Sequence, residues 1–413
     1  MGGYQMSHSR SGTTALVGLA IFAASLVAEA AHADMPPLLW RREVSLREYG
    51  YVSAVAVNSV GDVIVAGPTN GPFGGPNRGG TDIFVAVFSP DGALRLRRHP
   101  GSSEGDGEAR AAINAAGNFA VGGSTQGSIA KRNEGRRDGF VIRYSPTGLV
   151  QWRRQPASRK DDVLTAIATN DAGSVVVAGW TNGWLMGPVS DFQDAFVVKY
   201  AANGVEQWGH QLGMASDAQG VAVDAAGNVA AAGNTDGPGM FVVSYAADGK
   251  QRWQRQISPA FTILTGGGVV IDAAGNVVVS GSTTGSLGGP HNGGRDIIVA
   301  GYSPDGRLLW MQQPGTASDD WPLGLSLDAA TGNFILGWQA YDDLHGEYST
   351  YFSVYSSNGA LVKTLPVPRS PSGELISAFA TDGAGNIYTA GMTVNDNPEK
   401  SIFFLNKYAP LVP

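Results

Sequence analysis

Aromatic, acidic and imidazole side chains that can bind a ligand gather in one stretch of the chain, between Thr316 and Thr350. Its two segments read TASDDWPLG and WQAYDDLHGEYST. Flat rings beside carboxylates suit stacking on, and hydrogen bonding to, a sugar or a peptide. His345 with two acids can also hold a metal ion or act as a general base. The predicted ligand-binding residues are Trp321, Trp338, Tyr341, Asp342, Asp343, His345 and Glu347. The alternative is an ordinary polar surface loop.

A second set of acidic residues recurs at the ends of glycine-rich segments such as TNGPFGGPNRGGTD and TTGSLGGPHNGGRD. The aspartates that end these segments are Asp82, Asp138, Asp194 and Asp296. Loops rich in Gly and Asp can bind Ca²⁺ through carboxylates and carbonyls. Because one carboxylate per loop is few for that ion, we favour an Asp that caps backbone N–H groups of its own turn. Ca²⁺ stays the one cofactor that this pattern allows.

A further acidic position recurs eight residues before the Asp or Asn that ends an apolar segment. It holds Asp106, Asp162, Asp320 and Glu374, and Asp217 stands one place off. Such carboxylates can bind a cation or a basic partner. Their repetition favours a structural hydrogen bond, since an active site seldom needs symmetry.

Motifs of several enzyme classes are absent from the sequence. It contains no Cys nucleophile, no H-E-x-x-H and no G-x-x-x-x-G-K-[ST]. His99, His210 and His291 lie far apart in the sequence without an obvious partner, and Trp180 and Trp184 form a second, smaller aromatic group. A catalytic site is therefore not predicted, although scattered residues can assemble one.

These residues are positioned by a repeat. An apolar segment, a turn with Gly and Asn or Asp, and a second apolar segment ending in Gly occur seven times, as in AVAVNSVGDVIVAG at 54–67. The segment-ending glycines are spaced by 48 to 56 residues, within the range of propeller blades. They are Gly67, Gly123, Gly179, Gly233, Gly281, Gly337 and Gly391.

Each repeat predicts four strands, A to D. In the first they are Ala54–Asn58, Val63–Gly67, Ile83–Ser89 and Ala93–Arg98, with Gly-containing turns between A and B and between C and D. Four residues after the second turn glycine, strand D carries an aromatic residue that we expect to pack between blades. It is Trp152, Trp208, Trp253 or Trp310, with Leu96 and Lys363 in its place in the first and sixth repeats.

The N-terminal segment supplies the fourth strand that the seventh repeat lacks. The seventh repeat stops after its third strand, IFFLNKYAP, whereas PLLWRREV near the N-terminus contains Trp40 in the tryptophan position. We therefore predict an all-β, seven-bladed β-propeller of four-stranded blades. Leu38–Val44 pairs into the last blade and closes the ring.

This pattern resembles the SBBP family of bacterial β-propeller repeats. The carrying motif is D-x-x-G-N-V-x-V-x-G-x-T followed by G-G-x-D-x-x-V-x-x-Y-x-x-x-G-x-x-x-W, best seen from Asp272 to Trp310. The resemblance implies an exported protein and a binding scaffold. The fourth repeat departs from it by a shortened loop (TDGPGM) and the sixth by the loss of its Trp.

The N-terminal residues predict export. Residues 1–33 combine a short polar start, the apolar run TTALVGLAIFAASLVA and the small residues Ala31-His32-Ala33, which is typical of a cleaved signal peptide. We therefore expect a propeller domain at 34–413, in the periplasm or outside a bacterial cell. No later segment is long and apolar enough to span a membrane.

Composition narrows the partners. A net charge of −7 argues against nucleic-acid binding, and the absence of cysteine leaves burial and strand pairing to hold the fold. We expect a monomeric, non-catalytic binding or scaffold protein that recognises a glycan or protein ligand on its loop face. The alternative is an extracellular polysaccharide lyase or hydrolase with its site at the channel mouth.

Overall fold

The computed structural model describes residues 35–190, 192–235, 237, 239–257, 262–263, 268–342, 346–368, 374–393 and 401–411. They belong to one compact unit, Asp34–Pro413. Within these ranges every regular element is a β-strand, and no helix is present that could cross a membrane. The predicted signal peptide, residues 1–33, lies outside the described residues.

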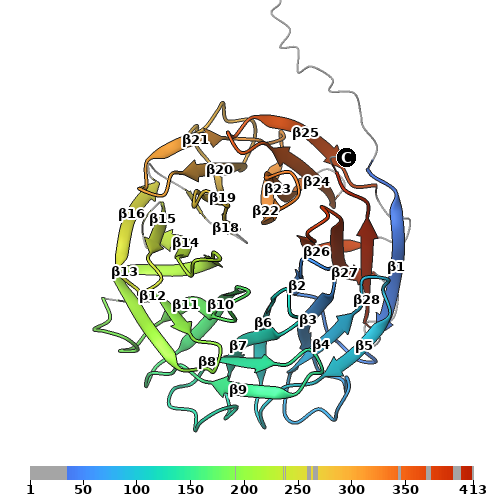
Figure 1. The fold of residues 1–413 in the computed structure, drawn as a ribbon, viewed down its shortest axis with the longest axis vertical. Helices are drawn as coiled ribbons and strands as arrows, with labels where there is room; N and C mark the ends of the chain where they lie inside the picture. The colour runs from blue at the N-terminus through green and yellow to red at the C-terminus, as the bar shows by residue number, and fades with distance from the viewer. Residues whose placement is uncertain are drawn as a thin grey trace, which may run out of the picture. The chain divides into compact units, whose positions relative to one another are not determined.

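Seven antiparallel blades surround a central axis, so the predicted all-β, seven-bladed propeller is confirmed (Figure 1). Blade 1 consists of β2 (Ala54–Val57), β3 (Val63–Thr69), β4 (Asp82–Phe88) and β5 (Leu94–Arg98). Blade 2 consists of β6 (Asp106–Ile113), β7 (Phe119–Thr125), β8 (Asp138–Tyr144) and β9 (Val150–Arg154). Blade 3 consists of β10 (Asp162–Thr169), β11 (Val175–Thr181), β12 (Asp194–Tyr200) and the first part of β13 (Glu206–Val223).

The second part of β13 is the innermost strand of blade 4, which continues with β14 (Val229–Thr235), β15 (Met240–Tyr245) and β16 (Gln251–Ile257). Blade 5 consists of β17 (Thr262–Ile263) and β18 (Val269–Ile271), which both pair with β19 (Val277–Thr283), then β20 (Asp296–Tyr302) and β21 (Leu308–Gln312). Blade 6 consists of β22 (Asp319–Asp328), β23 (Asn333–Asp342), β24 (Glu347–Tyr355) and β25 (Leu361–Pro366). Blade 7 consists of β26 (Leu375–Thr381), β27 (Ile387–Thr393), β28 (Ile402–Tyr408) and β1 (Leu38–Ser45).

The hydrophobic core is divided among the junctions between blades. Seven clusters of buried side chains each combine residues of two neighbouring blades. Strands β3, β4, β7 and β8 are buried along their whole length, which explains why their sequences read as continuous apolar runs and do not alternate. Packing between blades therefore holds the ring.

Tryptophans of the outer strands latch each blade to the next one. The indole N–H groups of Trp40, Trp152, Trp208 and Trp253 donate to backbone carbonyls in the following blade's C–D turn, at 2.9 to 3.1 Å. The rings also lie against the turn glycine, since a Cβ added at Gly306 would come 2.6 Å from Cγ of Trp253. The turn glycine and the tryptophan of one repeat thus belong to two different junctions.

A second latch stands two residues after the tryptophan position. The guanidinium Nε atoms of Arg42, Arg98 and Arg255 donate to the carbonyls of the turn glycines in the next blade, at 2.7 to 2.9 Å. His210 holds this place in blade 3, with Nε2 at 2.7 Å from the Gly249 carbonyl. The sequence analysis missed these residues, although their fixed offset from the tryptophan was visible.

The ring is closed by the N-terminal strand. Strand β1 pairs antiparallel with β28, with Val44 opposite Phe403 and Glu43 opposite Phe404, so blue and red strands lie side by side in Figure 1. Its Trp40 and Arg42 then latch onto blade 1. The closing strand thereby covers an edge that would otherwise expose unpaired N–H and C=O groups.

Candidate functional site

Blade 6 differs from the other blades by a long hairpin. Its strands β23 and β24 have 10 and 9 residues, whereas β3 and β4 of blade 1 have 7 each. Residue pairing continues past Gln339 and Thr350 to the pairs Tyr341–Tyr348 and Asp342–Glu347. The glycine-rich B–C loop of blade 1 is therefore replaced here by additional β-ladder, which carries Tyr341, Asp342 and Glu347 of the predicted ligand-binding residues.

Two tyrosines stand opposite one another near the tip of this hairpin. The rings of Tyr341 and Tyr348 lie 4.9 Å apart, and Tyr348 is 45% exposed. Glu347 is exposed as well. Alternation along the paired strands puts Trp321 on the same sheet face as the two tyrosines, and the Arg295 guanidinium lies 4.0 Å from the Trp321 ring. These aromatic residues are thus brought to one end of blade 6.

The remaining predicted residues are placed differently. Trp338 is only 4% exposed, stacks on Tyr351 at 4.4 Å and donates its indole N–H to Ser353 Oγ at 3.0 Å. It belongs to the core cluster between blades 5 and 6, so in this structure it packs and does not offer its ring at the surface. The Asp342 side chain, Asp343 and His345 lie outside the described residues.

A second exposed aromatic pair lies in the B–C loop of blade 3. Trp184 is 74% exposed and Phe192 78% exposed, which are large values for such apolar side chains. Trp180, at the end of β11, is covered by the Arg137 guanidinium at 5.6 Å from its ring. Of the two tryptophans that the sequence singled out here, only Trp184 presents an open ring.

The aspartates that end the glycine-rich loops are fully buried and cap their own turns. Each accepts the backbone N–H of the residue four positions earlier, at 2.8 to 3.1 Å. This is the structural role that the sequence analysis favoured for Asp82, Asp138, Asp194 and Asp296. Oxygen Oδ1 of Asp82 and of Asp296 has no hydrogen-bond partner in the described part of the chain.

A glutamine three residues after the tryptophan position completes this turn, and sequence reasoning missed it. In blade 2, Gln155 donates from Nε2 to Asp138 at 2.9 Å and accepts the Ile129 N–H at 2.9 Å. Gln211 and Gln313 repeat both contacts. In blade 1 the position holds buried His99, whose Nε2 lies 3.7 Å from the Asp82 carboxylate and whose Nδ1 lies 3.5 Å from the Phe73 N–H donor atom.

The acidic residues at the start of the A strands are also structural. Asp106, Asp162 and Asp320 accept the backbone N–H and the hydroxyl of a Ser or Thr four residues earlier. Burial raises the pKa of Asp106 and of Asp320 to about 6, although these hydrogen bonds act in the opposite direction. Glu374 instead pairs with Arg41 of the closing strand. Asp106 also lines a pocket of about 260 Å³ together with Glu108 and Arg137.

Histidines and a serine motif elsewhere in the described ranges do not form a metal or catalytic site. There, no three His, Asp or Glu side chains are grouped as metal ligands. Gly101–Gly105 has the spacing G-x-S-x-G, but it connects strands β5 and β6, whereas a nucleophile elbow joins a strand to a helix. His210 stacks on Tyr245 at 4.7 Å, and His291 lies 3.8 Å from Asp296.

Comparison with known proteins shows similarity in fold. No protein-family model matches the sequence, and no curated protein does. The β-propeller domain of the Trilobed protease from Pyrococcus furiosus has 8% identity and a TM-score of 0.52, over 87% of this chain and 95% of that one. The Neurospora crassa Pan2 WD40 domain has 12% identity and a TM-score of 0.51, over 86% and 89%. Polysaccharide lyase Uly1 has 9% identity and a TM-score of 0.50, over 86% and 89%. Such low identities show the propeller fold alone, and the SBBP resemblance stays an interpretation of the repeat.

Proposed function

We propose that this chain is an exported, non-catalytic binding protein that recognises a glycan or protein ligand on its loop face. The observation that carries this proposal is the extended hairpin of blade 6, which presents Tyr341 and Tyr348 beyond the length of the neighbouring strands. A rigid ladder holds these rings in place, so little conformational entropy is lost when a ligand stacks on them. The export part of the proposal depends on the residue pattern of positions 1–33.

Exposed Trp184 and Phe192 support the same proposal independently. Large aromatic side chains on loops of a rigid scaffold are typical of binding surfaces. Together with the blade 6 hairpin, they favour a ligand that is recognised by ring stacking. A glycan is the first candidate, since sugar rings stack on aromatic faces and their hydroxyl groups can bond to Glu347.

A glycan array and a pull-down with soluble polysaccharides test this function on the chain from Asp34 onward. Tyr348→Ala and Trp184→Ala should each weaken binding about tenfold, because each removes a stacking ring. Leu149→Ala is the matched control, since Leu149 is 68% exposed in a C–D turn of blade 2. Binding that is unchanged in both aromatic variants would rule out this surface.

The enzyme alternative is decided in the same experiment. Uly1 is a polysaccharide lyase with a similar fold, but Asp106 and Asp320, whose pKa is raised to about 6, are buried and bonded to their own turns. Each bound glycan is assayed for cleavage, and product that disappears in Asp343→Ala and His345→Ala would replace the binding proposal by the enzyme. Loss of binding in EDTA would assign Ca²⁺ as a cofactor.

A further inference from the structure

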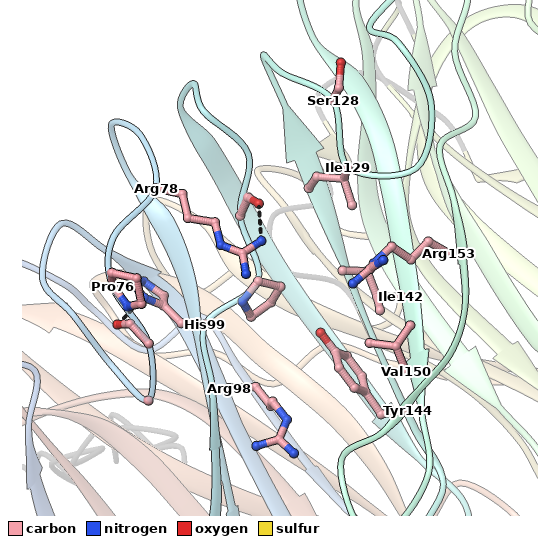
Figure 2. Close-up of a pocket in the computed structure, with 14 residues that line it drawn as sticks. Pro76, Arg78, Arg98, His99, Ser128, Ile129, Ile142, Tyr144, Val150 and Arg153 are labelled. Atoms are coloured by element: carbon pink, nitrogen blue, oxygen red, sulfur yellow. Dashed lines mark hydrogen bonds between the residues drawn. The ribbon is translucent and has the colours of Figure 1, made fainter.

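A cavity of about 320 Å³ lies between the outer strands of blades 1 and 2 (Figure 2). Blade 1 contributes its glycine-rich B–C loop and the end of β5, and blade 2 contributes residues of β8 and β9. This site is separate from the blade 6 hairpin and does not depend on the function proposed above.

The junction that contains this cavity lacks the tryptophan of the repeat. At three other junctions the indole of Trp152, Trp208 or Trp253 lies 5.4 to 5.8 Å from the tyrosine that ends the C strand of the next blade. Leu96 stands at the tryptophan position of blade 1 and lies against the turn glycine Gly148. The equivalent tyrosine at this junction, Tyr144, therefore has no indole beside it, and it lines the cavity, whereas Leu96 does not.

Tyr144 points its hydroxyl group into this space (Figure 2). The residue is only 3% exposed, and its hydroxyl has no hydrogen-bond partner among the described residues. Burial raises the pKa of Tyr144 to about 12, so the phenol is protonated at neutral pH and can donate a hydrogen bond. Because the hydroxyl faces the cavity, it can donate to a ligand or to water there.

The charges around the cavity are all positive. Arg78, Arg98 and Arg153 line it, and none of its lining residues is acidic. Arg98 is held by the Gly148 and Thr147 carbonyls, so it contributes charge more than free donors. Arg78 and Arg153 are exposed; Arg78 has only a 3.5 Å contact to the Gly101 carbonyl, and Arg153 has no hydrogen bond or ion pair in the described part of the chain. Their guanidinium groups are therefore available to a ligand.

The groove at the next junction has a lining of mixed charge. The groove between blades 2 and 3 contains Tyr200, the equivalent of Tyr144, and also the acidic residue Glu206. Glu206 pairs with Tyr200 as Val150 pairs with Tyr144. The same repeat position thus holds an acid in one groove and an apolar side chain in the other, and Arg153 lines both grooves.

We propose that the cavity between blades 1 and 2 binds an oxyanion, a sulfate or phosphate group, through Arg78, Arg153 and the hydroxyl of Tyr144. Guanidinium groups bind such anions with paired, charge-assisted N–H···O bonds. The tyrosine donates a further hydrogen bond to an oxygen that neither arginine reaches. The charged ligand also relieves the mutual repulsion of the three guanidinium groups.

Isothermal titration calorimetry with sodium sulfate and with inorganic phosphate, at matched ionic strength against sodium chloride, tests the site. We expect saturable binding of at least one of the two anions. The anion that binds shows whether the natural ligand carries a sulfate or a phosphate group. Arg78→Gln and Arg153→Gln should each weaken it about tenfold, and Tyr144→Phe by a few fold. Arg307→Gln is the matched control, because it removes one exposed charge from blade 5.

Trp321→Ala should leave anion binding unchanged, which separates this site from the blade 6 hairpin. No saturable binding of either anion, or wild-type affinity in folded Arg78→Gln and Arg153→Gln variants, would overturn the proposal.

Discussion

Two glycines of blade 5 can separate the latch between blades from the conformational preference of a turn. Gly275 and Gly306 have nearly the same backbone angle, with φ of +82° and +81°. An alanine in this left-handed region costs about 1–2 kcal/mol at either position. The space around them differs. A Cβ at Gly275 would lie 3.5 Å from Pro304 Cγ, whereas at Gly306 it would lie 2.6 Å from Trp253 Cγ.

Gly306→Ala must therefore displace the Trp253 indole in addition to straining the turn. Overpacking of this kind adds about 1–3 kcal/mol. We expect Gly275→Ala to lower the free energy of unfolding by about 1–2 kcal/mol and Gly306→Ala by about 2–5 kcal/mol. Guanidinium unfolding, followed by tryptophan fluorescence and by circular dichroism, measures both values if the two signals coincide.

The indole is removed in the second half of the experiment. Trp253→Ala alone should lower the free energy of unfolding by about 3–5 kcal/mol, since Trp253 is 6% exposed and its N–H bonds to Pro304. In a chain that already lacks this indole, Gly306→Ala should lower the free energy of unfolding only by the smaller amount expected for Gly275→Ala. Two results would refute the claim that the Trp253 indole packs on Gly306. One is an equal effect of the two glycine substitutions in the wild-type chain, and the other is an effect of Gly306→Ala that stays the same without the indole.

Three further predictions concern other parts of the ring. Burial gives Asp106 a pKa of about 6 in the folded chain, above the roughly 3.9 of an unfolded Asp, so the folded state binds more protons between these values. This group therefore makes stability fall as pH rises from about 4 to about 6, and urea unfolding over that pH range should show a smaller fall in Asp106→Asn. His99→Gln should unfold at the wild-type temperature because Gln155, Gln211 and Gln313 hold the same position, whereas His99→Ala should melt earlier. Deleting residues 1–45 removes β1 and should lower the melting temperature and produce aggregates in size-exclusion chromatography, because β28 becomes an edge strand. A chain beginning at Asp34 is the control for this deletion and should remain monodisperse.

The repeat made much of the fold predictable. Strand B of blade 1 was expected at Val63–Gly67 and extends over Val63–Thr69, and the closing strand was expected at Leu38–Val44 and extends over Leu38–Ser45. Both predictions depend on local signals, namely turn glycines and apolar runs. The caps at Asp82 and its equivalents were predictable for the same reason, since each contacts a backbone group four residues away.

Contacts between repeats were harder to predict. The tryptophan of one repeat packs on the turn glycine of the next, but the same two residue types also occur four positions apart within each repeat. One sequence therefore cannot say which pair is in contact. The length of the blade 6 hairpin could not be predicted from the sequence for a related reason. Its residues Ala340 to Asp342 are ordinary strand or loop residues, and only pairing with Glu347 to Ser349 shows them to be ladder.

Two repeats lack the latching tryptophan, and the structure explains them differently. Lys363 stands at this position in blade 6, and the blade that follows has no C–D turn, because its last strand comes from the N-terminus. No turn glycine is present there for an indole, and Lys363 donates instead to the carbonyl of Leu411. That departure is a consequence of how the ring closes.

Leu96 has no such explanation. The turn with Gly148 is present in blade 2, and Arg98 still latches onto it, so the geometry of this junction would accept an indole. The junction nevertheless has a smaller side chain, an open cavity and an uncovered tyrosine hydroxyl beside unpaired arginines. The leucine does not account for the cavity, because it is not among the lining residues and because grooves also occur at the junctions of Trp40 and Trp152. What distinguishes the cavity between blades 1 and 2 is a lining with three arginines and no acidic side chain, whereas the other two grooves contain Glu43 and Glu206.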